Sequence, residues 1–155
     1  MIRVWRLSPA IYMDRFLSGG GAYRQGGRWN SPGRAVVYMA ESLSLCTLEL
    51  LVHMLKLPMM HNFQQVCVDI PEKLITTAAK NKLPKDWNSI PAGIGSKKFG
   101  DKWFEDGRSP VLKVPSAIIP TEHIYVLNPS HQDFQKLKIG EIKPFEFDTR
   151  LFPRT

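Results

Sequence analysis

The chain has 155 residues, of which 43% are hydrophobic and 23% charged, and these values fit one globular domain over residues 1–155. No apolar run approaches the roughly 20 residues that span a bilayer, so we expect no membrane association. The net charge of +7 suits an anionic partner, but the basic residues are scattered, with Lys97 and Lys98 as the adjacent pair, which argues against a long nucleic-acid-binding arm.

The first third of the chain predicts a strand, a short helix and a glycine-rich loop. Residues 2–7, "IRVWRL", alternate at period two and predict a strand, and Pro9 opens a short helix through Phe16. "SGGGAYRQGG" has five glycines and predicts a mobile loop, in which residues 19–27 are a candidate for closing over a substrate. It lacks the spacing of a nucleotide P-loop. "NSPG" at 30–33 predicts a turn.

A short strand and an apolar helix follow this turn. In "AVVYMA" the side chains of Val36, Tyr38 and Ala40 point to one side of the predicted strand. Ser42 is a plausible N-cap of the next helix, which we expect to run to about Leu55 and to end before Pro58.

One carboxylate interrupts this apolar helix. At about 100° per residue the apolar side chains cover nearly its whole circumference, which predicts a buried helix, and Glu49 and His53 fill the gap. A buried carboxylate is unfavourable unless it is paired or faces a polar cavity. Glu49 therefore pairs with a basic residue such as Arg28 or Arg34, lies where the edge of the helix meets water, or lies in a cleft where Arg28 holds an anion. A lone histidine such as His53 is more often structural, so we leave it out of the catalytic set.

The rest of the chain predicts three strands, a helix and a terminal strand pair. The strands are "FQQVCVDI" (63–70), "SPVLKVPS" (109–116) and "HIYVLN" (123–128), and the helix lies near "KKFGDKWFED" (97–106). The tail "KIGEIKPFEFDTRLF" predicts one or two strands, and Pro144 places the second at an edge. The fold class is therefore α+β, with a split or curved mixed sheet and flanking helices.

Cysteines and histidines give no sign of a metal or redox site. Cys46 and Cys67 are too far apart for a CxxC pair and lie in apolar segments, so we expect reduced packing residues. The four histidines show no HxH or HExxH spacing, and we expect no metal. The start "MIRVWRLSPA" lacks the features of a signal peptide, so the default location is cytoplasmic.

Several polar residues have ordinary explanations when each is read alone. Arg28 is typical of a surface residue, and Tyr38 is typical of a half-buried position on a strand. Ser116 is typical of a turn or a helix cap, and Asn128 is typical of the position before a proline turn.

Read together, these residues lie in four blocks: "GGRWNSPGRAVVYMAES", "LCTLELLVH", "GDKWFEDGRSPVLKVPSAIIPTEHIYVLNPSH" and "PFEFDTRLF". In this order the chain resembles the RES-domain toxins of bacterial RES/Xre toxin–antitoxin systems, over nearly its whole length. The resemblance implies an ADP-ribosyltransferase-like fold that acts on NAD as a substrate, with no prosthetic group. The implied reaction is phosphorolysis or hydrolysis of the nicotinamide glycosidic bond, or ADP-ribosyl transfer to a protein.

The resemblance also implies the site. The family's arginine, glutamate and serine fall on Arg28, Glu49 and Ser116, its strand tyrosine on Tyr38 and its "NP" asparagine on Asn128. This order of arginine, glutamate and serine differs from that of many ADP-ribosyltransferases, and no ExE pair follows the helix.

Roles follow from the chemistry of the implied reaction. Glu49 would stabilise an oxocarbenium-like ribose, Arg28 would bind the pyrophosphate or a ribose-linked phosphate, and Tyr38 would stack on nicotinamide. These three residues form the implied catalytic set. The implied NAD-binding set comprises Arg28, Tyr38, Ser116, Asn128, Trp29 and Tyr23, although core packing explains Trp29 equally well.

The resemblance implies a cognate Xre-type DNA-binding antitoxin, and a homodimer is compatible with the sequence. No direct nucleic-acid binding by this chain is expected. The alternative is a basic RNA-binding or RNA-cleaving toxin, with aromatic residues among lysines as stacking platforms (Trp87, Phe99, Trp103 and Phe104). A third hypothesis is a non-catalytic partner-binding module. The acceptor, whether water, phosphate or a protein, stays open.

Overall fold

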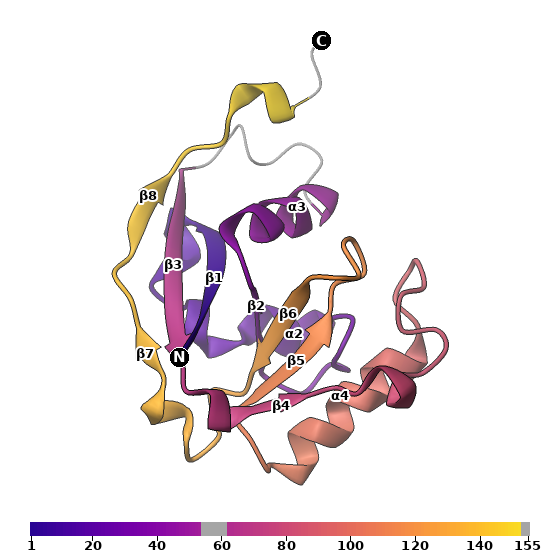
Figure 1. Cartoon of the computed structure of the whole chain (residues 1–155). Helices are drawn as coiled ribbons and strands as arrows, with labels where there is room; N and C mark the ends of the chain where they lie inside the picture. Colours follow the sequence, from indigo (N-terminus) through magenta and orange to yellow (C-terminus); the bar gives the residue numbers. More distant parts are fainter. Residues whose placement is uncertain (54–61, 153–155) are drawn as a thin grey trace.

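A curved mixed sheet organises the protein, as the computed structural model in Figure 1 shows; the structure describes residues 1–53 and 62–152. The strand order is β4-β5-β6-β2-β1-β3-β7, and β8 also pairs with β3. β4 and β5 run parallel and the other neighbours antiparallel. The predicted α+β class with a curved mixed sheet is confirmed. The strands are β1 (Ile2–Pro9), β2 (Val37–Ala40), β3 (Phe63–Ile70), β4 (Ile75–Thr77), β5 (Val111–Pro115), β6 (His123–Leu127), β7 (Lys138–Ile139) and β8 (Lys143–Phe145).

The joint between β1 and β2 is narrow. β1 pairs with β3 along its full length, from Ile2 opposite Ile70 to Pro9 opposite Phe63. Its registered pairing with β2 is Trp5 opposite Ala40. Beyond this joint β2 pairs with β6, and in Figure 1 the strands β4, β5 and β6 turn away from the direction of β1 and β3. The sheet therefore curls at the β1–β2 joint.

In the described part of the chain the α-helices that flank the sheet are α1 (Ala10–Met13), α2 (Gly20–Gln25), α3 (Leu43–His53) and α4 (Ile94–Asp106). The predicted N-cap of α3 is confirmed, because the Leu45 amide donates to Ser42 Oγ at 3.0 Å. The predicted end near Leu55 and Pro58 lies outside the described residues. Within residues 1–53 and 62–152, no helix combines the length and apolar character needed to cross a bilayer.

The prediction of a mobile glycine-rich loop is wrong for residues 20–25, which form α2. Gly19 has φ of 67°, and its carbonyl accepts the Tyr23 amide at 2.9 Å, closing the first helical turn. A Cβ at position 19 would lie 2.7 Å from the Val36 nitrogen. The glycine thus permits both a left-handed turn and a close backbone approach, and these contacts override the low helix propensity of the segment.

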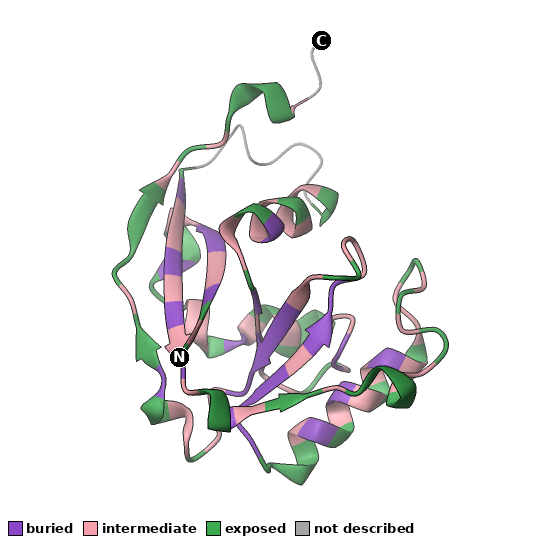
Figure 2. Ribbon diagram, viewed as in Figure 1, coloured by how far each residue is buried: buried purple, intermediate pink, exposed green. Residues whose placement is uncertain are grey.

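The prediction that the apolar helix is buried throughout is also wrong. In α3 only Leu45 is buried, while 40% of Leu48 and 55% of Val52 are exposed (Figure 2). The helix contacts β1 and β2 through one side, so its other apolar side chains remain near the surface. Glu49 lies between these extremes, partly exposed.

Two hydrophobic clusters lie on opposite faces of β2. Val37 and Met39 pack in the first cluster with residues of β1, β3 and β6. Val36 and Ala40 pack in the second cluster, and Tyr38 lies against it. The predicted alternation along this strand is confirmed. The second cluster also contains Trp29, Leu45 of α3 and Trp103 of α4, so it joins the segments that carry the predicted site residues. Its buried members are Trp29, Val36, Ala40, Leu45, Trp103, Leu112, Val114, Ile124 and Val126.

Candidate active site

Glu49 and Ser116 meet although 67 positions separate them in the chain. Glu49 lies on α3, and Ser116 follows the last residue of β5. Ser116 Oγ donates a hydrogen bond to Glu49 Oε1 at 2.8 Å. No hydrogen bond to Glu49 Oε2 occurs among the described residues, so this oxygen is available to a ligand. Glu49 therefore presents one oriented and one free oxygen on a partly exposed side chain.

The Ser116 hydroxyl is fully used within the protein. Besides donating to Glu49, its oxygen accepts the backbone amides of Ile118 and Ile119, each at 3.1 Å. A hydroxyl offers one donor and two acceptor positions, and all three are occupied. Ser116 is also fully buried. The geometry thus supports a role in orienting the carboxylate rather than in touching a ligand.

Tyr38 links β2 to the segment that contains Arg28. Its hydroxyl accepts the Trp29 amide at 3.0 Å and donates to Asn30 Oδ1 at 2.6 Å. A Cβ at Gly27 would lie 2.6 Å from this hydroxyl, so glycine makes room for it. Burial raises the pKa of Tyr38. The hydroxyl therefore stays protonated at neutral pH and holds the backbone around Arg28.

Arg28 uses one edge of its guanidinium on a neighbouring loop. Nη1 donates to the carbonyl oxygens of Trp87 at 3.1 Å and Ser89 at 2.8 Å. Nε and Nη2 have no hydrogen bond among the described residues. These two nitrogens form the planar fork that binds carboxylates and phosphates with two parallel hydrogen bonds. Arg28 can thus bind an anion while the loop fixes its other edge.

Arg6 is a candidate site residue that was not predicted from the sequence. Its Nη1 donates to the Tyr38 carbonyl at 2.9 Å, and its Nε is enclosed without a partner among the described residues. Burial lowers the pKa of Arg6, and Cys46 of α3, one helical turn before Glu49, is close enough to affect it. No carboxylate in the described part of the chain pairs with this cation. An anionic ligand would supply the missing charge.

The period-two pattern alone did not distinguish Arg6 from Arg3. Arg6 has the same parity along β1 as Val4, which is fully buried, and Arg3 has the same parity as Leu7, which is also buried. The structure separates the two arginines, because Arg3 pairs with Asp69 at 2.7 Å, whereas Arg6 has no carboxylate partner among the described residues.

Asn30 also has a role that was not predicted, because the sequence indicated only a turn at this position. It is 1% exposed, and its Nδ2 donates to the carbonyls of Ala22 at 3.0 Å, Ser31 at 3.1 Å and Arg34 at 3.3 Å. Its Oδ1 accepts the Tyr38 hydroxyl. Asn30 therefore ties α2 and the 30–34 turn to the strand tyrosine.

The remaining predicted binding residues lie in different surroundings. Trp29 is buried and stacks on Trp87 at 6.4 Å between ring centroids, which agrees with the core-packing alternative. Tyr23 is half exposed on α2. Asn128 follows β6, at the opposite end of that strand from Ser116, and its Oδ1 accepts the Ser130 amide at 3.0 Å. The structure thus brings Glu49 together with Ser116, and Tyr38 together with the segment of Arg28. Asn128 lies at the other end of β6 from Ser116.

Comparison with known proteins identifies the family. Residues 3–148 match the family model described as RES domain. The chain belongs to the RES domain family. "Toxin Res" of Photorhabdus laumondii is 40% identical over 150 residues, which cover 96% of each chain. "Prs ADP-ribosylating toxin" of a Sphingobium strain is 35% identical over 152 residues, covering 95% of this chain and 94% of the relative.

A solved structure shares the RES fold. It is described as a crystal structure of the M. tuberculosis MbcT–MbcA toxin–antitoxin complex, and the match has a TM-score of 0.74. The alignment covers 93% of this chain and 84% of the other, at 20% identity. The predicted family membership and fold are therefore confirmed.

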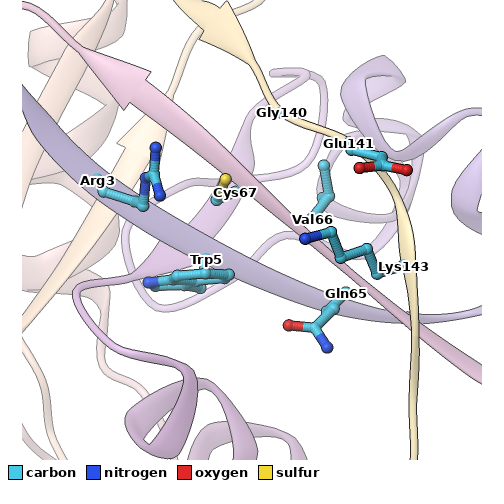
Figure 3. Close-up of a pocket in the computed structure, with 8 residues that line it drawn as sticks. All are labelled: Arg3, Trp5, Gln65, Val66, Cys67, Gly140, Glu141 and Lys143. Atoms are coloured by element: carbon cyan, nitrogen blue, oxygen red, sulfur yellow. The ribbon is translucent and has the colours of Figure 1, made fainter.

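A cavity of about 270 Å³ on this RES domain lies away from the predicted site residues. Figure 3 shows Arg3, Trp5 and Cys67 on one side of it and Gly140, Glu141 and Lys143 on the other. Arg3 is already paired with Asp69, and the oppositely charged Glu141 and Lys143 line the same wall. Its lining therefore shows no preference for an anion such as NAD.

Metal-ligating side chains do not gather in the described part of this RES domain, which contains no group of three or more His, Cys, Asp or Glu residues placed to hold an ion. His53 is exposed on the last turn of α3, one turn beyond Glu49. The candidate site offers a carboxylate from Glu49, two guanidinium groups from Arg6 and Arg28, and the Tyr38 hydroxyl.

Proposed function

We propose that this RES-domain chain is a toxin that cleaves the nicotinamide–ribose bond of NAD. The observation that carries the proposal is the Glu49 carboxylate, which the buried Ser116 hydroxyl orients while its second oxygen accepts no hydrogen bond from the described residues. The names of the relatives support it, because one is described as an ADP-ribosylating toxin and another as Toxin Res.

Glu49 acts on the ribose. As the bond between nicotinamide and C1 of the ribose breaks, nicotinamide leaves with the bonding electrons and positive charge develops on the sugar ring. A fixed carboxylate stabilises this oxocarbenium-like state and accepts hydrogen bonds from ribose hydroxyls. The acceptor then forms the new bond to C1 and loses a proton. Water, inorganic phosphate and a protein side chain all fit this scheme.

The two arginines bind the anionic part of the substrate. Arg28 binds the pyrophosphate with Nε and Nη2, which make no hydrogen bond to the described residues. The negative charge of the pyrophosphate also balances the positive charge of Arg6. Tyr38 holds the backbone that follows Arg28 through its hydrogen bonds to Trp29 and Asn30, and presents its ring beside nicotinamide. Ser116 acts through Glu49.

A cognate antitoxin neutralises the toxin in this proposal. The fold relative was solved in a toxin–antitoxin complex, and the family resemblance implies an Xre-type DNA-binding partner. The net charge of +7 complements an acidic partner surface.

The structure does not favour the alternative of an RNA-binding or RNA-cleaving toxin. The aromatic residues that suggested base stacking pack inside the second cluster or against it: Trp87, Phe99, Trp103 and Phe104. Side chains in such packing present no row of faces to successive bases.

The test is release of nicotinamide from NAD by the purified protein, with and without inorganic phosphate. Glu49→Gln, which keeps the side-chain volume, should lose release while its unfolding curve stays close to that of the parent. Phosphate-dependent release would indicate phosphorolysis, and release in buffer alone would indicate hydrolysis. If the parent releases nicotinamide only after candidate acceptor proteins are added, ADP-ribosyl transfer is the reaction. No release under any of these conditions would overturn the proposal.

A further inference from the structure

Helix α4 runs beside the segment that carries Arg28 and contacts it at regular intervals. Lys97 Nζ donates to the Gly27 carbonyl at 2.6 Å. One turn later Asp101 accepts the Ser31 amide at 2.8 Å and the Ser31 hydroxyl at 2.6 Å. One turn further, the Glu105 carboxylate pairs with Arg34. Positions four apart lie on one helix face, so a single face of α4 holds the whole segment 27–34.

Gly100 brings the helix backbone against this segment. A Cβ at position 100 would lie 1.7 Å from the Trp29 carbonyl oxygen, closer than any atom can approach. The Trp29 ring also packs edge-on against Phe99, with 5.8 Å between ring centroids. At Trp29 the segment therefore lies directly against the backbone of α4.

The contacts of α4 reach the site through two short paths. The Gly27 carbonyl belongs to the peptide bond that joins Gly27 to Arg28, so Lys97 fixes the backbone from which the Arg28 side chain extends. Asp101 fixes Ser31, next to Asn30, whose Oδ1 holds the Tyr38 hydroxyl. Lys97 thus acts on Arg28 through the Gly27 carbonyl, and Asp101 acts on Tyr38 through Ser31 and Asn30.

We infer that Lys97 is a positioning residue that sets the location of Arg28 for NAD binding, and that Asp101 does the same for Tyr38. This inference rests on the proposed function. Neither side chain touches the proposed substrate; each acts through the backbone or side chain that it holds. A guanidinium displaced by a fraction of an ångström loses the geometry of its two parallel hydrogen bonds.

The kinetic test separates positioning from simple stabilisation. Because Arg28 binds the pyrophosphate, Lys97→Met should raise KM for NAD by roughly tenfold with little change in kcat, and Lys97→Arg should restore KM. If Lys97 acts through Arg28, then Lys97→Met should have almost no further effect in an Arg28→Lys background. Equal effects in both backgrounds would overturn the positioning role. Lys102→Met is the matched control, because Lys102 lies on the same helix and pairs with the exposed Asp106 at 3.2 Å.

A second measurement does not depend on NAD. Amide hydrogen exchange followed by NMR should show faster exchange of the Trp29 amide, the donor to Tyr38, in Asp101→Asn than in the parent or in Asp106→Asn. An unchanged Trp29 amide would overturn the path from Asp101 to Tyr38. If the parent releases no nicotinamide, the proposed function fails, and this exchange measurement alone decides whether α4 fixes the segment.

Discussion

Replacing Ser116 with alanine tests whether the buried hydroxyl orients Glu49. The change removes the 2.8 Å hydrogen bond to Glu49 Oε1 and the acceptor of the Ile118 and Ile119 amides. A hydrogen bond to a charged group contributes about 1.5–3 kcal/mol. If all of it acts on the transition state, Ser116→Ala should lower kcat for nicotinamide release by roughly 10- to 150-fold.

The same substitution also affects stability, so a control of similar structural cost is needed. Two partly buried amides without an acceptor should lower the free energy of unfolding by about 2 kcal/mol. Ser109 provides the control because it is also a buried serine beside β5, where its hydroxyl accepts Trp103 Nε1 at 3.1 Å. Ser109→Ala should be destabilised to a similar degree in urea unfolding, with kcat close to that of the parent.

The assay measures nicotinamide release under conditions where every variant is more than 95% folded according to its unfolding curve. If Ser116→Ala and Ser109→Ala lower kcat equally, the loss reflects stability and the assigned role of Ser116 is wrong. If Ser116→Ala keeps full kcat, Glu49 does not depend on this hydrogen bond.

Three further predictions concern the surroundings of the site. Gly100→Ala forces a Cβ to within 1.7 Å of the Trp29 carbonyl and should lower Tm by roughly 5 °C or more, whereas Gly21→Ala, also in a helix, meets no atom within 4 Å and should not lower it; equal Tm values would contradict the close packing. Burial raises the pKa of Tyr38 above its ordinary value of 10.0, so the folded protein keeps a proton that the unfolded chain loses. The free energy of unfolding should therefore fall as pH rises above about 10, and less steeply in Tyr38→Phe, so parallel curves would count against this assignment. Burial raises the pKa of Cys46 to about 11, so iodoacetamide should label Cys46 far more slowly at pH 8 in the native protein than in urea, and equal rates would exclude a buried thiol.

Elements with strong local patterns were predictable from sequence. The alternating residues of 2–7 and 63–70 form β1 and β3, and the turn before "AVVYMA" and the N-cap Ser42 are where the pattern predicted. β4 was missed because a three-residue edge strand has no periodicity to detect. The helix at Gly20–Gln25 was missed because local propensity does not record its tertiary contacts, such as the hydrogen bonds from Asn30 to the Ala22 carbonyl and from Gly33 to the Tyr23 carbonyl.

The site was predictable only in part, and for a similar reason. The carboxylate of Glu49 was conspicuous because it interrupts an apolar helix, and the family resemblance added Ser116, whose contact with it spans 67 positions. The network of Asn30 and the supporting face of α4 could not be predicted, because each depends on which segments the fold places side by side. Asn128 shows the opposite limit, since the sequence placed it at the end of the 123–128 strand but gave no information that Ser116 would lie at the start of that strand.

Because the β1–β2 joint is narrow, a ligand bound across it would help to hold the two parts of the sheet together. Arg6 lies on β1, Tyr38 on β2, and α3 with Glu49 contacts both strands, so the candidate site spans the joint. A compound that bridges Arg6 and Arg28 would brace two halves of the sheet that share one registered residue pair there. Its binding free energy would then oppose separation of the halves, so an inhibitor search by thermal shift should favour bridging compounds over those that occupy one side.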